Sequence, residues 1–292
     1  MRGAEFPIPR SLAAAAAAEA RESWLETLPS IVTEIESAWS LTVGQPFEPG
    51  GQTAWVAPAV SATGDQRVVK LGWRHYEAEH EADGLCAWGG NGAVVLYDVA
   101  EYPQTNVLLL EQCAPGRVLA SEPELRQDVV IADLLRRLWI APPAINNFRS
   151  LAEVSERWAN QCDADLNAGK ISMDPALAAE GVAVLRSLSA SARDQVLLCT
   201  DLHADNVLSA QRAPWLVIDP KPFVGDPAFD VVQHLLNCPE RLHDDPLGLV
   251  DRVADLAGVD HDRVRLWLFA RCVQESSEEP ALVAVARRLA VR

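Results

Sequence analysis

The stretch DLHADN at residues 201–206, together with the apolar segment WLVIDP at residues 215–220, contains the residues that decide the fold. Asp201 and Asn206 are five residues apart, and Asp219 follows Asn206 by thirteen residues. Residues 207–218 are typical of a β-hairpin, because two β-rich arms flank a polar turn. Two antiparallel arms of similar length return the chain beside its starting point, so we expect Asn206 and Asp219 to face each other.

These three polar side chains suit one kind of chemistry. Amide and carboxylate oxygens are the hard ligands that Mg²⁺ takes when water and nucleotide phosphate fill the rest of its shell, so Asn206 and Asp219 are predicted metal ligands. Asp201 is placed to orient an attacking hydroxyl and accept its proton. Any one of these residues alone would more often cap a turn. The joint pattern is more specific, because Asp-Leu-x-x-x-Asn is the spacing of a kinase catalytic loop.

A kinase also needs a cation on the phosphates, and Lys70 ends the strand-like segment RVVK. A strand-end lysine at a sheet edge commonly serves only solubility. The order of Lys70, Asp201 and Asp219 along the chain favours the phosphate-binding interpretation. The carboxylate partner should come from the next helix, where Glu77, Glu79 and Glu81 are candidates. We favour Glu81, since it heads the apolar stretch of that helix.

Two further segments are candidates for nucleotide binding. A glycine pair before the first long strand could let backbone N–H groups approach phosphate, although it lacks the full G-x-G-x-x-G pattern and a plain turn is the alternative. A second segment falls between the predicted lobes, where main-chain groups could bond an adenine edge. The residues of these two segments are Gly50, Gly51, Gln52, Thr53, Glu111 and Cys113.

The periodicity predicts an α+β fold with a β-rich first lobe over residues 1–112 and a mainly helical second lobe over 113–292. Two helices lead the first lobe, and a charged helix interrupts its strands. We expect helices over residues 11–20, 24–39 and 75–88, and strands over 53–60, 66–71, 94–99 and 107–110. In the second lobe we expect helices over 124–139, 151–165, 175–187, 229–237, 247–257 and 264–276, and a strand over 196–198.

Composition narrows the function. The 292 residues include 25 Lys and Arg against 41 Asp and Glu, a formal net charge of -16, which disfavours a nucleic-acid partner and would attract a cationic one. The acidity could also serve solubility alone. The six cysteines are spread singly, so neither a zinc site nor a disulfide framework is expected. Without eighteen uninterrupted apolar residues we expect no membrane span and a cytoplasmic protein.

The motifs resemble the streptomycin 6-phosphotransferases and hydroxyurea phosphotransferases, a branch of the aminoglycoside-phosphotransferase group with a protein-kinase-like bilobal fold. The segments that carry the resemblance are VKLGW at 69–73, EADGL at 81–85, LLLE at 108–111 and WLVIDPKP at 215–222 through GDP at 225–227. The resemblance implies ATP and Mg²⁺ as cofactors, with Asp201 as the base and Asp230 and His203 supporting its loop.

Two departures from the family pattern bear on the site. Relatives usually carry His two residues before the catalytic Asp, whereas this chain has Cys199. The support that this His gives to the catalytic loop in relatives is therefore not expected in the same form here. Relatives also carry a Trp after an Arg-x-x-Gln in the last long helix, and this chain lacks it. That region resembles the acceptor side, so the acceptor could differ from streptomycin. The candidate substrate residues are Asp226, Arg271, Gln274, Glu275 and Glu278.

The sequence therefore predicts a kinase that phosphorylates a hydroxyl of a small cationic molecule, such as an aminoglycoside, and so confers antibiotic resistance. Hydroxyurea or an amino sugar is an alternative acceptor, and a non-enzymatic kinase relative is an alternative class. A protein kinase is disfavoured, because six residues between Asp219 and Asp226 leave no room for an activation segment.

Overall fold

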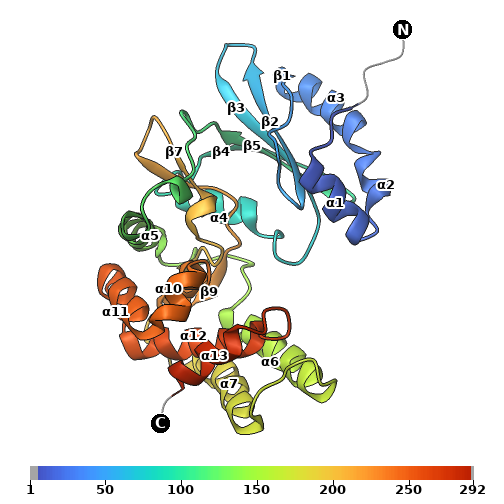
Figure 1. The fold of residues 1–292 in the computed structure, drawn as a ribbon. Helices are drawn as coiled ribbons and strands as arrows, with labels where there is room; N and C mark the ends of the chain where they lie inside the picture. The colour runs from blue at the N-terminus through green and yellow to red at the C-terminus, as the bar shows by residue number, and fades with distance from the viewer. Residues whose placement is uncertain (1–5, 291–292) are drawn as a thin grey trace. The chain divides into compact units, whose positions relative to one another are not determined.

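The computed structural model describes residues 6–290, which form two compact units (Figure 1). One unit contains the residues up to Gly90 together with Val94–Gly116, and the other contains Asn91–Ala93 together with the residues from Arg117 onward. This division differs from the predicted boundary after residue 112: residues 113–116 belong to the first unit, and residues 91–93 join the second. They do so because the N–H of Val217 donates to the carbonyl of Gly92 at 2.9 Å.

The first unit is built on a five-stranded antiparallel sheet in the order β1-β2-β3-β5-β4. Helices α1 to α3 pack on it, and their buried apolar side chains share one core with those of the sheet. Trp24 joins the two layers, because its indole N–H donates to the hydroxyl of Thr105 at 2.9 Å. The elements are α1 (Arg10–Ala18), α2 (Glu22–Leu25), α3 (Leu28–Trp39), β1 (Leu41–Val43), β2 (Ala54–Ser61), β3 (Gln66–Trp73), α4 (Glu81–Trp88), β4 (Leu96–Tyr102) and β5 (Thr105–Glu111).

Two helix predictions in this unit were wrong in extent. The helix expected over residues 24–39 is two helices, because Pro29 cannot donate a backbone N–H inside a helix and instead occupies the first turn of α3. The helix expected from residue 75 begins only at Glu81, after a turn. The strand β1 was not predicted, since three residues carry too little periodicity.

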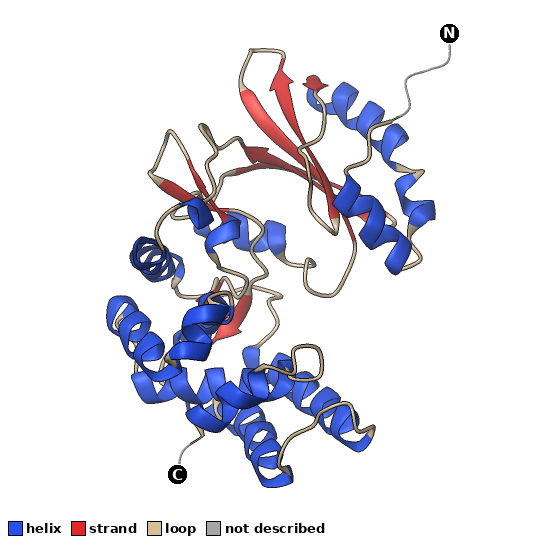
Figure 2. Ribbon diagram, in the orientation of Figure 1, coloured by secondary structure: helices blue, strands red, loops and turns tan. Residues whose placement is uncertain are grey.

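The second unit is mainly helical and contains two short antiparallel ladders, β6 with β9 and β7 with β8 (Figure 2). The strands are β6 (Val196–Leu198), β7 (Val207–Ser209), β8 (Trp215–Val217) and β9 (Phe223–Gly225). The helices are α5 (Glu124–Leu138), α6 (Leu151–Asn167), α7 (Pro175–Ser187), α8 (Pro227–Asp230), α9 (Val232–Leu236), α10 (Pro239–Asp244), α11 (Pro246–Ala257), α12 (His261–Glu275) and α13 (Leu282–Leu289), with single 3₁₀ turns η1 (Leu119–Ser121), η2 (Ser189–Ser191) and η3 (Ala204–Asn206).

The ladder pairing places two chain connections side by side. Residues 199–206 join β6 to β7, and residues 218–222 join β8 to β9. Because β6 pairs with β9 and β7 pairs with β8, both ends of these two connections are fixed next to each other. The helix expected over residues 229–237 is divided into α8 and α9, and α10, α13 and β9 were not predicted. Within residues 6–290, no helix is long and apolar enough to cross a membrane.

Candidate active site

In the first unit, Lys70 and Glu81 form a buried ion pair. Nζ of Lys70 donates to both carboxylate oxygens of Glu81 at 2.7 Å. Lys70 lies on β3, the middle strand of the sheet, so the edge-strand interpretation does not apply to it. The two side chains are 11% and 6% exposed, and a buried charge is tolerated only when it is paired. The partner favoured from the sequence is therefore the one observed, whereas Glu77 and Glu79 lie in the turn before α4.

The glycine-containing segment lies between β1 and β2. Gly50 has a φ of 80°, and a Cβ there would lie 2.5 Å from Cβ of Pro9, so packing alone requires a glycine at this position. Gly51 and Gln52 are exposed, and the carbonyl of Thr53 accepts a hydrogen bond from the N–H of Trp73 at 3.1 Å. A phosphate-binding role for this segment stays a prediction.

The segment predicted to bond adenine follows β5. Glu111 ends this strand, and one of its carboxylate oxygens accepts a hydrogen bond from the N–H of Val95 at 3.0 Å. Cys113 is partly exposed, and a Cβ on Gly116 would lie 3.0 Å from the Cys113 carbonyl oxygen. The turn after Cys113 therefore requires glycine, while the role of Glu111 and Cys113 toward a nucleotide stays a prediction.

In the second unit, Asp201 lies at the centre of a polar cluster. Its Oδ2 is 2.9 Å from Nζ of Lys221, and its Oδ1 accepts a hydrogen bond from Nε2 of Gln233 at 3.3 Å. Nε2 of His203 lies 3.9 Å from Oδ1. The side chain of Asp201 is 17% exposed, so one edge of the carboxylate stays accessible to a reacting molecule. Such a carboxylate can orient a hydroxyl and accept its proton.

The loop that carries Asp201 is supported by Asp230. Its two carboxylate oxygens accept hydrogen bonds from the N–H groups of Cys199 at 2.9 Å and Thr200 at 2.6 Å, and Trp139 donates its indole N–H at 3.0 Å. Complete burial raises the pKa of Asp230 to about 6, although these three donors favour the charged form. Asp230 therefore lies where the resemblance implied a supporting residue.

The substitution of His by Cys199 does not leave the loop unsupported. The carbonyl of Cys199 accepts hydrogen bonds from the N–H groups of Asp201 at 2.9 Å and Lys221 at 3.0 Å. Thr200 has a φ of 57°, and its hydroxyl donates to the carbonyl of Lys221. Burial raises the pKa of the Cys199 thiol well above its usual range, so this thiol stays neutral and takes no part in charge chemistry.

Asn206 and Asp219 are adjacent, as the predicted hairpin required. Val207 pairs with Val217 across the ladder, and the N–H of Ile218 donates to the carbonyl of Asn206 at 2.9 Å. The side-chain amide of Asn206 donates through Nδ2 to the carbonyl of Asp201 at 2.9 Å. Because the amide nitrogen is engaged there, the amide oxygen is left to accept or to coordinate. Asp219 adopts a φ of 53°, a strained conformation that often marks functional positions.

Asp226 is buried and joins two helices of the second unit. Asp226 is 3% exposed, and one oxygen caps α8 by accepting from the N–H of Ala228 at 3.0 Å. The other oxygen accepts from Trp267 at 2.8 Å and from Nε of Arg263 at 2.9 Å. The carboxylate of Asp226 therefore joins α8 to α12, while a contact of Asp226 with the substrate stays a prediction.

Helices α9, α10, α12 and α13 border a hollow of about 330 Å³, and one of its lining residues, Gln233, contacts Asp201. Gln233 lines it from α9, and Arg271 and Glu275 line it from α12, which was predicted as acceptor side. Arg271 stacks on Trp158 at 4.5 Å and donates to Glu275. Glu279 also lines the hollow, whereas Glu278 is exposed outside it and Gln274 does not line it. Helix α12 ends at Glu275 and the chain then turns. Of the two glutamates after this turn, Glu279 is the one that lines the hollow.

Lys221 and Gln233 both contact the Asp201 carboxylate, and neither was predicted from the sequence as a site residue. Lys221 lies in the motif WLVIDPKP, and its position two residues after Asp219 was the available signal. Gln233 carries no local signal, since its contact with Asp201 spans 32 residues.

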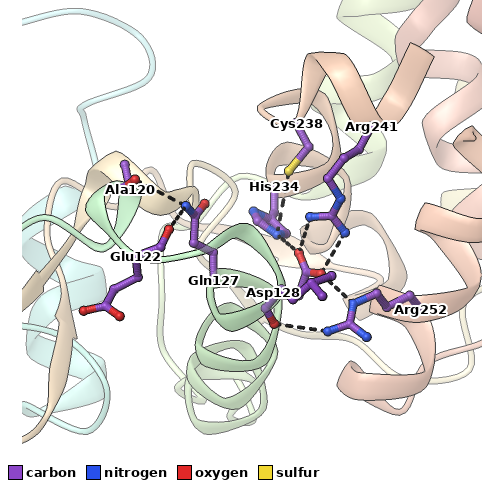
Figure 3. Close-up of polar contacts among 9 residues, drawn as sticks. Ala120, Glu122, Gln127, Asp128, His234, Cys238, Arg241 and Arg252 are labelled. Carbon is purple, nitrogen blue, oxygen red and sulfur yellow. Dashed lines mark hydrogen bonds and ion pairs between the residues drawn. The ribbon is translucent and has the colours of Figure 1, made fainter. Parts of the chain in front are cut away.

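A second buried cluster surrounds Asp128 and includes His234 of α9 (Figure 3). The Asp128 carboxylate on α5 accepts hydrogen bonds from Nε2 of His234 at 2.9 Å, from both terminal nitrogens of Arg241 at 2.9 and 2.8 Å, and from Nε of Arg252 at 2.7 Å. Sγ of Cys238 lies 4.0 Å from the same imidazole nitrogen. Asp128, His234 and Cys238 have metal-ligand side chains, but three cations already occupy the carboxylate, so the cluster is an ion-pair network.

Comparisons with known proteins match most of the chain to one family of kinases. Residues 39–279 match a family model described as aminoglycoside/hydroxyurea antibiotic resistance kinase. The chain is 31% identical over 304 residues to streptomycin 6-kinase of Streptomyces glaucescens, covering 97% of this chain and 96% of the relative. It is 36% identical over 267 residues to hydroxyurea phosphotransferase of Kitasatospora aureofaciens, covering 87% and 74%.

Solved structures share the fold. A choline kinase from Streptococcus pneumoniae superposes with a TM-score of 0.59 at 15% identity, covering 90% of this chain and 97% of the other. An aminoglycoside phosphotransferase from Streptomyces rimosus, solved with ADP and streptomycin, gives a TM-score of 0.54 at 18% identity, covering 89% and 98%. These likenesses confirm the predicted kinase-like α+β fold.

Proposed function

Because the chain belongs to the aminoglycoside/hydroxyurea antibiotic resistance kinase family, and is a small-molecule kinase, we propose that it transfers the γ-phosphoryl group of ATP to a hydroxyl of a cationic antibiotic. Streptomycin is the first acceptor to test, since relatives 31% and 32% identical to this chain are streptomycin 6-kinases. The observation that carries the proposal is that Gln233 contacts Asp201 and also lines a hollow. The carboxylates of Glu275 and Glu279 line the same hollow.

The acidic hollow supports a cationic acceptor. Glu275 is engaged by Arg271, so its charge is partly compensated, whereas Glu279 is exposed at the hollow's rim. An amine or guanidinium group would form charge-assisted hydrogen bonds with these carboxylates. The net charge of -16 adds a general attraction for cations.

Asp201 acts as the base in this proposal. The acceptor hydroxyl donates to the carboxylate, the oxygen of that hydroxyl forms a bond to the γ-phosphorus, and the bond between that phosphorus and the ADP oxygen breaks. The proton passes to Asp201 and the negative charge leaves with ADP. Lys221 balances the charge of Asp201 before the proton arrives, because its ammonium is 2.9 Å from the carboxylate.

Asn206 and Asp219 fit a Mg²⁺ site, since the engaged amide nitrogen of Asn206 leaves a neutral oxygen donor beside a carboxylate. Bound Mg²⁺ would neutralise charge on the triphosphate. In the first unit, Lys70 would contact the phosphates while Glu81 holds its ammonium in place. Gly51, Gln52, Glu111 and Cys113 are proposed to contact the nucleotide through backbone groups.

The test is product formation with purified protein. The protein is incubated with ATP and Mg²⁺ and, separately, streptomycin, hydroxyurea and an amino sugar, and each mixture is analysed by mass spectrometry. We expect streptomycin to gain one phosphoryl group, and Asp201→Asn to abolish that product. Phosphorylation of hydroxyurea alone would assign this chain to the other branch of the family, in line with its 36% identity to hydroxyurea phosphotransferase. No product with any acceptor, in a protein that binds ATP, would contradict the proposal.

A further inference from the structure

Gln233 connects the base to the acceptor hollow. Its side-chain amide donates to Oδ1 of Asp201 at 3.3 Å, and the same side chain lines the hollow together with Glu279. A molecule in the hollow can therefore contact Gln233, and Gln233 in turn contacts Asp201. The residue is partly exposed, so it is accessible from the hollow.

The two oxygens of Asp201 are held with different strengths. Oδ2 faces the Lys221 ammonium at 2.9 Å, a charge-assisted contact of ordinary length. Among residues 6–290, the hydrogen-bond donor to Oδ1 is the neutral amide of Gln233 at 3.3 Å, which is at the long, weak end of the range for N–H···O bonds. His203 is 3.9 Å from Oδ1, beyond hydrogen-bond distance. A hydroxyl donor would therefore displace Gln233 from Oδ1 more easily than Lys221 from Oδ2.

The backbone that carries Gln233 is firmly anchored. The next residue, His234, is bonded to the buried Asp128, which also binds Arg241 and Arg252 (Figure 3). The carbonyl of Gln233 accepts hydrogen bonds from the backbone and side-chain N–H groups of Asn237 at 3.2 and 2.9 Å. The amide of Gln233 can therefore swing about its side-chain bonds while α9 stays in place.

We propose that Gln233 is a specificity-determining residue that caps the proton-accepting oxygen of Asp201 until an acceptor hydroxyl from the hollow displaces it. This inference rests on the proposed function. While the cap is present, a water molecule beside Asp201 competes with the Gln233 amide for Oδ1, so ATP hydrolysis is slower. A bound acceptor displaces the cap because the hollow holds its hydroxyl near Oδ1 in a fixed orientation. A water molecule is not oriented in this way. The displaced amide then hydrogen-bonds the acceptor.

The experiment measures coupling, defined as ADP released per phosphorylated acceptor formed. Wild-type protein and Gln233→Ala are assayed with ATP, Mg²⁺ and streptomycin, and with ATP and Mg²⁺ alone. For Gln233→Ala we expect ADP release without acceptor to rise by up to about tenfold, because one weak hydrogen bond contributes roughly 1.4 kcal/mol or less. The ratio of ADP to phosphorylated streptomycin should rise above the wild-type value. Gln233→Leu, which keeps the side-chain volume without the donor, serves if the alanine variant does not fold.

Gln127→Ala is the matched control. Like Gln233, Gln127 is partly exposed and directly precedes a residue of the Asp128–His234 pair. Unlike Gln233, it donates its side-chain amide to the carbonyls of Ala120 and Glu122. We expect it to retain wild-type coupling. An unchanged ADP-to-product ratio in a folded Gln233 variant would overturn the inference while leaving the proposed function intact. A wild-type protein that forms no phosphorylated acceptor at all would overturn both, and this outcome is seen before any variant is made.

Discussion

Nζ of Lys221 lies 2.9 Å from Oδ2 of Asp201, although the two residues belong to different loops. Lys221 is on the connection from β8 to β9, and the N–H of Lys221 donates to the carbonyl of Cys199 at 3.0 Å, which fixes that connection against the Asp201 loop. A cation so close to the base can also approach the phosphoryl group that arrives there, and such contacts stabilise charge in the transition state.

Replacing Lys221 by Met should therefore lower kcat more than it raises KM. We expect a loss of about 100-fold or more in kcat, because removal of one preorganised electrostatic group typically has that effect. Steady-state assays with ATP and streptomycin measure it. Lys170→Met is the matched control, since Lys170 also forms a 2.9 Å ion pair, with Asp165, but its side chain is 63% exposed. Equal kcat values for the two variants would contradict the role of Lys221.

A second prediction concerns the buried pair of Lys70 and Glu81. Glu81→Leu leaves the Lys70 ammonium without its carboxylate in a site where Lys70 is 9% exposed. We expect the free energy of unfolding to fall by about 3 kcal/mol or more, as for other broken buried pairs. The double variant Lys70→Met with Glu81→Leu should recover part of this loss, because both charges of the buried pair are removed together. Urea denaturation measures both values, and a double variant less stable than the single one would contradict the prediction.

Elements with strong local signals were predicted with the observed bounds. The helix over Pro175–Ser187 has Asp174 as its N-cap, which accepts from the N–H groups of Ala176 and Leu177, and it has Pro in its first turn. The strand Val196–Leu198 is a short apolar run between polar residues. In each case the residues that specify the element are neighbours in the sequence, so local patterns suffice.

Residues whose role depends on distant partners were predicted less well. Asp226 lies in the motif GDP, but its partners Arg263 and Trp267 are 37 and 41 residues away, so its contacts with α12 were not predicted. Asp128 received no role, since its partner His234 is 106 residues away. By contrast, Asn206 and Asp219 were placed correctly beside each other because a single hairpin connects them. Side-chain spacing alone cannot supply contacts that tertiary packing creates.

A third prediction tests the charge of the acceptor. Glu279→Gln removes one carboxylate from the hollow, and we expect the KM for streptomycin to rise about tenfold, since a hydrogen bond between charged groups contributes roughly 1.5 kcal/mol or more. The matched control is Glu278→Gln, because Glu278 precedes Glu279 and is exposed outside the hollow. The difference between the variants should shrink at high salt, which screens exposed charges. Equal KM values at low salt would contradict a cation-binding role for Glu279.

The last prediction follows from the buried network around Asp128. Burial by itself would lower the pKa of His234, but the hydrogen bonds and charges of Asp128 and Cys238 raise it to about 9. Burial would likewise raise the pKa of Asp128, but its hydrogen bonds to His234, Arg241 and Arg252 hold it well below its usual range. Both shifts mean that the paired, charged state is favoured by folding.

The sign of the pH dependence follows from these two directions. A histidine whose folded pKa is raised from 6.5 to about 9 contributes stability that is fully present below pH 6.5 and is lost as the pH rises through about 9. The contribution of Asp128 is present above its ordinary pKa of 3.8 and is lost as the pH falls further. The network should therefore stabilise the fold most between these limits.

We therefore expect His234→Gln to lower the melting temperature most near pH 6, and to approach the wild type as the pH rises through 9. Thermal unfolding of both proteins between pH 5 and pH 10 measures this, with the temperature difference plotted against pH. His261→Gln is the control: His261 also pairs with two carboxylates, Asp251 at 3.0 Å and Asp255 at 2.9 Å, but its side chain is 42% exposed. Because solvent screens exposed pairs, the effect of His261→Gln should be much smaller at every pH. A constant difference for His234→Gln across this range would show that its imidazole contributes packing alone and not a charge paired with Asp128.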